Sequence, residues 1–141
     1  PEGHAETQIR LTEMDYFKSK IDQGADYICT QLFFDNHDFF DYRERCNLVG
    51  VDLPIVAGIM PITTISSMKR MADLAAGSRF PAKLLKRLSV ADGDAAAIRQ
   101  AGIDHAIEQC QELIGQSVAG LHRDELMKSS ATREIANALT F

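Results

Sequence analysis

A helical segment that leads directly into a short apolar segment with a polar end constrains the fold of this chain more than any other feature. Residues 27–35 are rich in strand-forming and aromatic side chains, and the polar exceptions are Thr30, Gln31 and Asp35. In a parallel α/β fold, above all in a βα barrel, ligands bind where strands end. Gln31 and Asp35 are therefore the first candidates for substrate contact. The alternative is that Gln31 satisfies a buried backbone group.

The apolar residues alternate between helical and strand spacing along the chain. This spacing predicts strands over 26–34 and 53–61, and helices over 9–23, 35–49, 63–77, 82–89, 94–115 and 129–139. Residues 118–127 stand where the alternation requires a third strand. Gly102 weakens the helix over 94–115 by about 1 kcal/mol relative to Ala and could bend it. The alternation as a whole indicates a parallel sheet.

Length and charge exclude several classes of protein. The chain has 141 residues, 45% of them hydrophobic, which suits one globular domain with its own core. Its net charge of -5 and the lack of a long Lys/Arg run argue against nucleic acid or an anionic membrane as a partner. The sequence shows neither an apolar run of ~20 residues nor a signal peptide, which predicts a cytoplasmic location. Because it opens at Pro1 without an initiator Met, we expect a piece of a longer protein.

The cysteines and histidines predict no metal site. Cys29, Cys46 and Cys110 are widely spaced among apolar neighbours, which is typical of reduced, buried thiols. The four histidines have no Cys or carboxylate at ligand spacing, and we expect His37 and His105 on the surface or at a helix edge.

Ordinary structural roles are expected for most other polar residues. The pairs Asp35/Asp38 and Asp92/Asp94 are expected to cap helices. Solvated helix faces are expected for Lys18, Lys83, Lys86 and Arg87.

Five motifs stay in register with one protein family along nearly the whole chain. They are Pro-Glu-Gly-His at 1–4, Gly-Ala-Asp-x-x-x-Thr-Gln-Leu-Phe-Phe-Asp at 24–35, Gly-Ile-Met-Pro-Ile at 58–62, Asp-Ala-Ala-Ala-Ile-Arg at 94–99 with Gly-Ile at 102–103, and Lys-Ser-Ser-Ala-Thr-Arg-Glu-Ile at 128–135. Through these motifs the sequence resembles the C-terminal portion of the catalytic barrel of methylenetetrahydrofolate reductase.

The resemblance implies a fold and an activity. The fold is α/β, the C-terminal part of a (βα)8 TIM barrel, with about three βα units and extra helices. Residues 1–141 would then form a single partial barrel domain that lacks the N-terminal strands. The family carries FAD and reduces 5,10-methylenetetrahydrofolate to 5-methyltetrahydrofolate with NADH or NADPH. A partial barrel of this kind implies a homo-oligomer or pairing with the missing half.

The resemblance also implies roles for particular residues. Its flavin-lining positions correspond to His4, Glu13, Tyr16 and Lys20, with Lys20 as a partner for the flavin phosphate. Its pterin-contacting glutamine corresponds to Gln31, and its folate- or nicotinamide-contacting positions on a later helix correspond to Ser67 and Met71. Without the resemblance, Met71 is expected in the core. No catalytic residue is assigned, because the family's catalytic carboxylates would lie in the missing N-terminal half.

One segment departs from the family. Residues 121–127 read Leu-His-Arg-Asp-Glu-Leu-Met where the family shows His-Phe-Tyr-Thr-Leu-Asn as its eighth strand. Three successive charged residues oppose a barrel wall, so we expect an irregular or helical connector, or an edge strand with its charges in solvent. The departure and the missing strands leave a second hypothesis open. The chain would then be a non-catalytic half-barrel that pairs with another chain or with itself.

Overall fold

Helices and strands alternate through the first half of the chain, and helices dominate the second half. The computed structural model describes residues 10–74, 78–123 and 130–139. The elements in order are α1 (Arg10–Ile21), β1 (Ile28–Leu32), α2 (Asn36–Leu48), β2 (Ile55–Ile59), α3 (Ile65–Leu74), α4 (Ala82–Val90), α5 (Ala95–Gly115), β3 (Gly120–Arg123) and α6 (Ser130–Ala138). The predicted helices and the first two predicted strands are therefore present, with ends that differ by a few residues.

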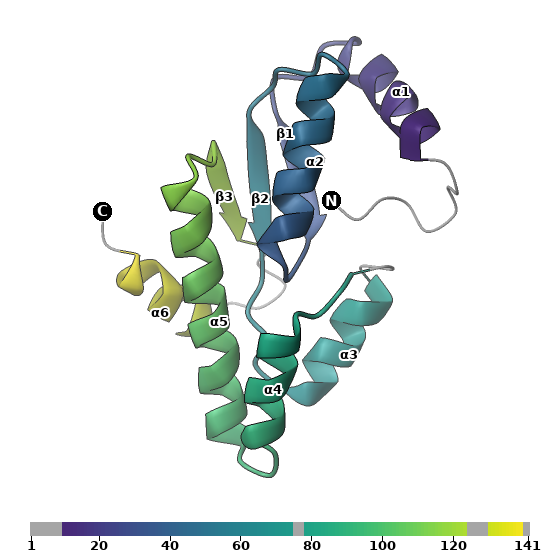
Figure 1. Cartoon of the computed structure of the whole chain (residues 1–141). Coiled ribbons are helices and arrows are strands. Elements are labelled where there is room, and N and C mark those ends of the chain that lie inside the picture. The colour runs from purple at the N-terminus through teal and green to yellow at the C-terminus, as the bar shows by residue number, and fades with distance from the viewer. Residues whose placement is uncertain (1–9, 75–77, 124–129, 140–141) are drawn as a thin grey trace.

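The strands form one parallel sheet with the order β1-β2-β3. In its register Ile28 lies opposite Ile55, and Val56 lies opposite Gly120. Figure 1 shows α2 and α5 beside one face of this sheet and α3 and α4 beyond the carboxyl ends of the strands. The predicted α/β class with a parallel sheet is confirmed, and the arrangement is consistent with part of an α/β barrel.

The segment that departs from the family forms a strand at its start. β3 pairs in parallel with β2, and Arg123 lies opposite Ile59. The expectation of an irregular or helical connector is therefore wrong for 121–123, because backbone pairing with β2 outweighs the poor strand propensity of the side chains. The edge-strand alternative agrees with the position of β3 at the end of the described sheet. Residues 124–127 lie outside the described residues.

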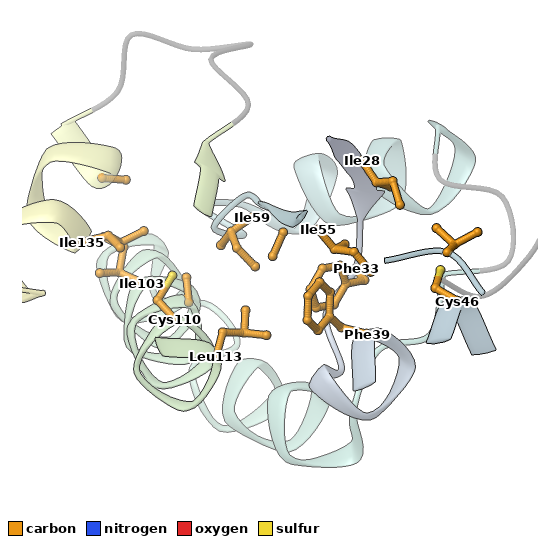
Figure 2. Packing of buried hydrophobic residues seen from close by; sticks show 14 of the residues in the cluster. Ile28, Phe33, Phe39, Cys46, Ile55, Ile59, Ile103, Cys110, Leu113 and Ile135 are labelled. Atoms are coloured by element: carbon orange, nitrogen blue, oxygen red, sulfur yellow. The ribbon is translucent and has the colours of Figure 1, made fainter. Parts of the chain in front are cut away.

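The core lies between the sheet and the helices on its covered face. Alternate β2 residues Ile55, Ala57 and Ile59 are buried there, as expected for the period of two in a strand. Figure 2 shows Ile55 and Ile59 with Leu113 and Cys110 of α5 and with Phe39 of α2. A second buried cluster lies beyond the carboxyl ends of the strands and contains Phe34, Ile62, Met71, Leu84, Leu88 and Ile98. The helices α3, α4 and α5 are thereby joined to the sheet.

The long helix α5 runs without interruption through Gly102. A Cβ atom at Gly102 would lie 1.6 Å from the carbonyl oxygen of Ile62, in the segment that follows β2. Glycine is therefore needed here for a close backbone approach, not for a bend. The sequence-based expectation of a weakened, bent helix does not take this contact into account.

The cysteines divide into two kinds. Cys46 and Cys110 are buried, as predicted, and burial raises the pKa of the Cys46 thiol. Cys29 is exposed, so the prediction of a buried thiol is wrong at this position. The reason is the alternation of β1, which places Cys29 on the strand face opposite to buried Ile28.

Candidate functional site

The face of the sheet opposite α2 and α5 carries exposed polar side chains. Burial alternates along β1, so that Cys29 and Gln31 are exposed while Ile28 is buried. On β3, His122 is also exposed, and it lies opposite Gly58 of β2. Because partners across a parallel sheet share a face, the register places Cys29 and His122 on one side of the described sheet through Val56 and Gly58, and that side is exposed.

A backbone irregularity in β1 lies next to Gln31. The register of β1 against β2 shifts between Cys29 and Leu32, which is a β-bulge. The Gly58 amide donates a 3.0 Å hydrogen bond to Thr30 Oγ1, and a Cβ atom at Gly58 would lie 2.7 Å from the Thr30 carbonyl oxygen. The Thr30 hydroxyl thus accepts the hydrogen bond of the Gly58 amide at the bulge. Gln31 remains exposed, with its amide available to a ligand.

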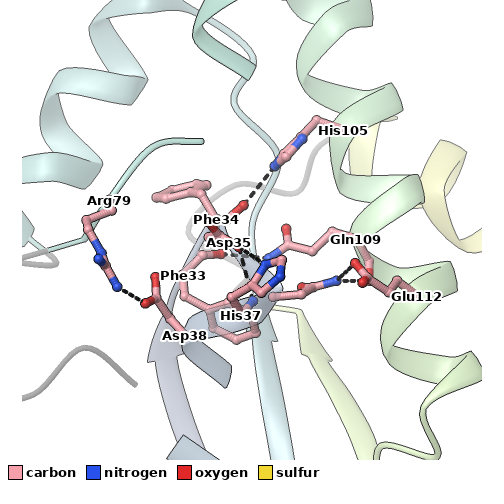
Figure 3. Close-up of polar contacts among 10 residues, drawn as sticks. Phe33, Phe34, Asp35, His37, Asp38, Arg79, His105, Gln109 and Glu112 are labelled. Carbon is pink, nitrogen blue, oxygen red and sulfur yellow. Dashed lines mark hydrogen bonds and ion pairs between the residues drawn. The ribbon is translucent and has the colours of Figure 1, made fainter. Parts of the chain in front are cut away.

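Polar side chains of α5 hold the chain where it leaves β1 (Figure 3). Gln109 Nε2 donates to the Phe33 carbonyl over 3.0 Å, and His105 Nε2 lies 2.9 Å from the Phe34 carbonyl oxygen. Asn36 Nδ2 in turn donates to the Gln109 carbonyl at 3.0 Å. The sequence patterns did not predict these contacts. The available signal was Gln109 itself, a polar residue three positions after Ala106 and four before Leu113 in the apolar stripe of the helix.

His105 is half-buried on α5, which agrees with the expected helix-edge position and not with a surface position. Burial lowers its pKa below the usual 6.5, and the hydrogen bond with the Phe34 carbonyl only partly opposes this shift. The ring is therefore neutral at pH 7. Because a carbonyl can only accept a hydrogen bond, the proton of the neutral ring is assigned to Nε2. His37, by contrast, is exposed as predicted.

We expect the free energy of unfolding to fall as the pH decreases from about 6.5 toward the lowered pKa of His105. The unfolded imidazole takes up a proton first, at its ordinary pKa of about 6.5, so acid favours the unfolded chain. The stabilisation that comes from neutral His105 is fully present above pH 6.5. Below that pH, the free energy of unfolding falls by at most about 1.4 kcal/mol per pH unit, because one proton is involved. Urea unfolding over this pH range measures it. The variant His105→Gln keeps a donor but does not titrate, and an equal slope in this variant would contradict the expectation.

The paired aspartates have different roles. Asp35 caps α2 by accepting from the His37 amide over 3.0 Å, and Asp94 caps α5 by accepting from the Ala96 amide over 2.9 Å, as predicted. The prediction for Asp38 is wrong. Its carboxylate is buried and forms an ion pair with Arg79, which lies before α4 in the sequence.

An ion-pair cluster joins α4 to α5. Lys83 Nζ and Arg87 Nη2 lie 2.8 Å and 2.7 Å from the carboxylate oxygens of Glu108. Hydrogen bonds from Arg87 and Lys83 lower the pKa of Glu108 to about 2. Lys83 is 63% exposed, so it lies on a solvated face as expected, whereas Arg87 is 31% exposed, and both are ion-paired across two helices.

Three of the residues that resemble flavin-lining positions, Glu13, Tyr16 and Lys20, lie on α1. The Lys20 ammonium is 5.1 Å from the ring centroid of Tyr16, and both side chains are exposed. Glu13 lies within the same helix, whereas His4 lies outside the described residues. Tyr16 and Lys20 are thus brought together, one turn apart.

The remaining predicted site residues lie on a different helix from these. Ser67 closes a reciprocal cap of α3: its amide donates to Thr64 Oγ1 at 3.0 Å, and the Thr64 amide donates to Ser67 Oγ at 3.1 Å. Met71 is buried in the second cluster. Figure 1 shows α3 beyond the carboxyl ends of the strands and α1 beside the opposite part of the sheet. The described structure therefore separates the proposed flavin-side residues from Ser67 and Met71.

The described residues contain neither a cluster of metal ligands nor a membrane-spanning helix. Among residues 10–74, 78–123 and 130–139, no three His, Cys, Asp or Glu side chains come together as metal ligands. Within the same ranges, no helix is both long and apolar enough to cross a membrane.

Comparison with known proteins assigns the chain to a family. The family model described as methylenetetrahydrofolate reductase matches residues 1–140. Methylenetetrahydrofolate reductase (NADH) 1 of Arabidopsis thaliana is 34% identical over 86% of this chain and 20% of the plant protein. The 5,10-methylenetetrahydrofolate reductase of Escherichia coli is 29% identical over 99% of this chain and 47% of the bacterial protein. The chain thus spans between about a fifth and a half of the length of these relatives, and it belongs to the methylenetetrahydrofolate reductase family.

Proposed function

We propose that this chain is the folate-side portion of a flavin-dependent oxidoreductase. The reaction is the reduction of 5,10-methylenetetrahydrofolate to 5-methyltetrahydrofolate, with NADH or NADPH as the reductant. Relatives named for NADH, in Arabidopsis thaliana, and for NADPH, in Caenorhabditis elegans, support a nicotinamide reductant without selecting one. We also propose a cytoplasmic location and a partial barrel that lacks its N-terminal strands.

The observation that carries the proposal is the exposed amide of Gln31 beside the carboxyl end of a parallel strand. This is where ligands bind in parallel α/β folds. The pterin ring of a folate has hydrogen-bond donors and acceptors side by side on one edge. A primary amide also offers one donor and one acceptor side by side, so it can form two hydrogen bonds with such an edge.

Tyr16 and Lys20 have the chemistry that an FAD site requires. The Lys20 ammonium suits a phosphate, and the exposed Tyr16 ring and hydroxyl suit a flavin or a ribityl group. When bound, FAD would accept hydride from the nicotinamide and pass it to the folate. The residues of this chain would hold and orient both partners. His4 and Glu13 complete the proposed flavin set.

Ser67 and Met71 are proposed as further folate or nicotinamide contacts on α3. Ser67 Oγ donates to the Thr64 carbonyl at 2.7 Å and accepts from the Thr64 amide, which leaves one lone pair for a ligand. Met71 is only 6% exposed, so contact with a ligand requires its neighbours to shift.

The second candidate function is a non-catalytic half-barrel that pairs with another chain or with a second copy. The observation that favours it is the open sheet. In the described sheet β1 and β3 are edge strands, and they carry the exposed residues Cys29, Gln31 and His122. Unpaired strand edges favour association. Size-exclusion chromatography of the full-length protein, combined with its flavin absorption spectrum, separates the two functions, because only the oxidoreductase retains flavin.

We expect the isolated 141-residue chain to retain FAD weakly or not at all, and the full-length protein to retain it well. Only part of the flavin site of the family matches residues of this chain, and weak sites lose ligand during dilution. The absorbance near 450 nm of each protein after size exclusion measures the difference. Stoichiometric flavin on the 141-residue chain would contradict this expectation.

We expect Gln31→Ala in the full-length protein to slow folate turnover by a few kcal/mol at most in activation free energy and to leave the fold intact. Only one or two hydrogen bonds to the substrate are lost. The test compares the melting temperature with the rates of flavin reduction by NAD(P)H and of folate reduction. A large loss of stability with unchanged folate kinetics would assign Gln31 a structural role instead.

A further inference from the structure

Two side chains of α5, one turn apart, hydrogen-bond to consecutive carbonyl groups directly after β1. Gln109 Nε2 donates to the Phe33 carbonyl at 3.0 Å, and His105 Nε2 donates to the Phe34 carbonyl at 2.9 Å. We propose that Gln109, with His105, is a positioning residue that sets the carboxyl end of β1 and thereby the amide of Gln31. This inference rests on the proposed role of Gln31 in folate binding.

The two carbonyl groups need these partners. Phe33 and Phe34 follow the last residue of β1 and are buried, so water does not reach the chain there as it reaches a surface loop. A buried carbonyl without a donor is costly, and a side-chain amide or an Nε2–H group supplies the donor that the sheet no longer offers. Figure 3 shows Gln109 and His105 reaching this segment from α5.

The same segment is held by packing on two sides. Phe33 stacks on Phe39 with ring centroids 5.5 Å apart, in the cluster beneath the sheet. Phe34 stacks on Phe80 with centroids 4.6 Å apart, in the second cluster. The two consecutive side chains therefore anchor the backbone in two different clusters. Gln31 is only two residues before Phe33, so a shift of the backbone at Phe33 would also move Gln31.

Gln109 is itself fixed by the helix that follows β1. Asn36, the first residue of α2, donates from Nδ2 to the Gln109 carbonyl at 3.0 Å and to Glu112 Oε2 at 2.7 Å. Both Asn36 and Gln109 are 5% exposed. Gln109 therefore lies in the interior of the protein, whereas Gln31 is exposed on the open face. Any effect of Gln109 on a ligand at that face must pass through β1.

A double-mutant cycle in the full-length protein tests this inference. The variants are Gln31→Ala, Gln109→Met and the double variant, with Gln100→Met as the control. Gln100 is an exposed glutamine of the same helix, and within the described part of the chain its side chain donates to Asp104. Methionine keeps the length of Gln109 and removes its donor. The measurements are KM for the folate, kcat, and the rate of flavin reduction by NAD(P)H.

We expect Gln109→Met to raise KM for the folate about tenfold and to change flavin reduction by less than about twofold, because one positioning hydrogen bond is lost. The double variant should have the same KM for the folate as Gln31→Ala alone, since both substitutions act through the amide of Gln31. Gln100→Met should match the parent. Additive effects of Gln31→Ala and Gln109→Met, or an unchanged folate KM in Gln109→Met, would overturn the inference.

Two further outcomes separate this inference from the proposed function. If Gln31→Ala leaves the folate KM unchanged, folate binding through Gln31 is wrong and the positioning role is overturned with it. If Gln31→Ala raises KM and Gln109→Met does not, only the positioning role is overturned. If Gln109→Met does not fold, variants of His105 test the positioning role instead. His105→Leu, which lacks a donor, must raise KM, and His105→Gln, which keeps one, must preserve it.

Discussion

Gly102→Ala is expected to destabilise the protein by about 3 kcal/mol, although alanine is the better helix former by about 1 kcal/mol. The new Cβ atom would lie 1.6 Å from the Ile62 carbonyl oxygen and 2.6 Å from its carbonyl carbon. These are backbone atoms, so no side-chain rotation can relieve the overlap. The helix α5 would have to move away from the segment after β2 and lose packing along its buried face. Urea unfolding followed by circular dichroism measures the change.

Gly115 provides the matched control at the end of the same helix. A Cβ atom there would meet no heavy atom within 4 Å. Gly115→Ala should therefore be neutral or slightly stabilising, because only the helix propensity changes. Equal stabilities for the Gly102 and Gly115 variants would show that α5 and Ile62 are not in close contact.

Phe39→Ala is expected to lower the free energy of unfolding by about 3–5 kcal/mol, the usual cost of removing a buried aromatic side chain. Phe39 is 0% exposed and lies where α2 meets the end of β1. Its ring stacks on Phe33 and meets the edge of Phe40, with centroids 5.9 Å apart in the second pair. The substitution leaves a cavity that these neighbours cannot fill without moving the backbone. Thermal and urea unfolding both report the loss.

Leu48→Ala is the control for this substitution. Leu48 belongs to the same helix and is 78% exposed, so its removal should change stability by no more than about 0.5 kcal/mol. A loss at Phe39 as small as that at Leu48 would contradict the placement of Phe39 in the core.

Local patterns in the sequence were sufficient to predict the element order and the parallel sheet. The caps Asp35 and Asp94 and the buried positions of β2 follow from rules that act over a few residues. The same rules placed a third strand at 118–127. The successive charged residues in this segment nevertheless favoured an irregular or helical connector. Pairing of β3 with β2 depends on a neighbour about 60 residues earlier in the chain, so local propensity could not decide it.

The candidate site divides in the same way. That Gln31 is polar and stands near the end of a strand was readable from the sequence, because strand period and polarity are local properties. Three other features could not be predicted from the sequence. They are the contact of Gly102 with Ile62, the half-buried, neutral ring of His105, and the hydrogen bond from Gln109 to Phe33. Each depends on atoms more than 35 residues apart in sequence. Only the packing of α5 against the strand ends brings them within a few ångströms, and this packing decides their roles.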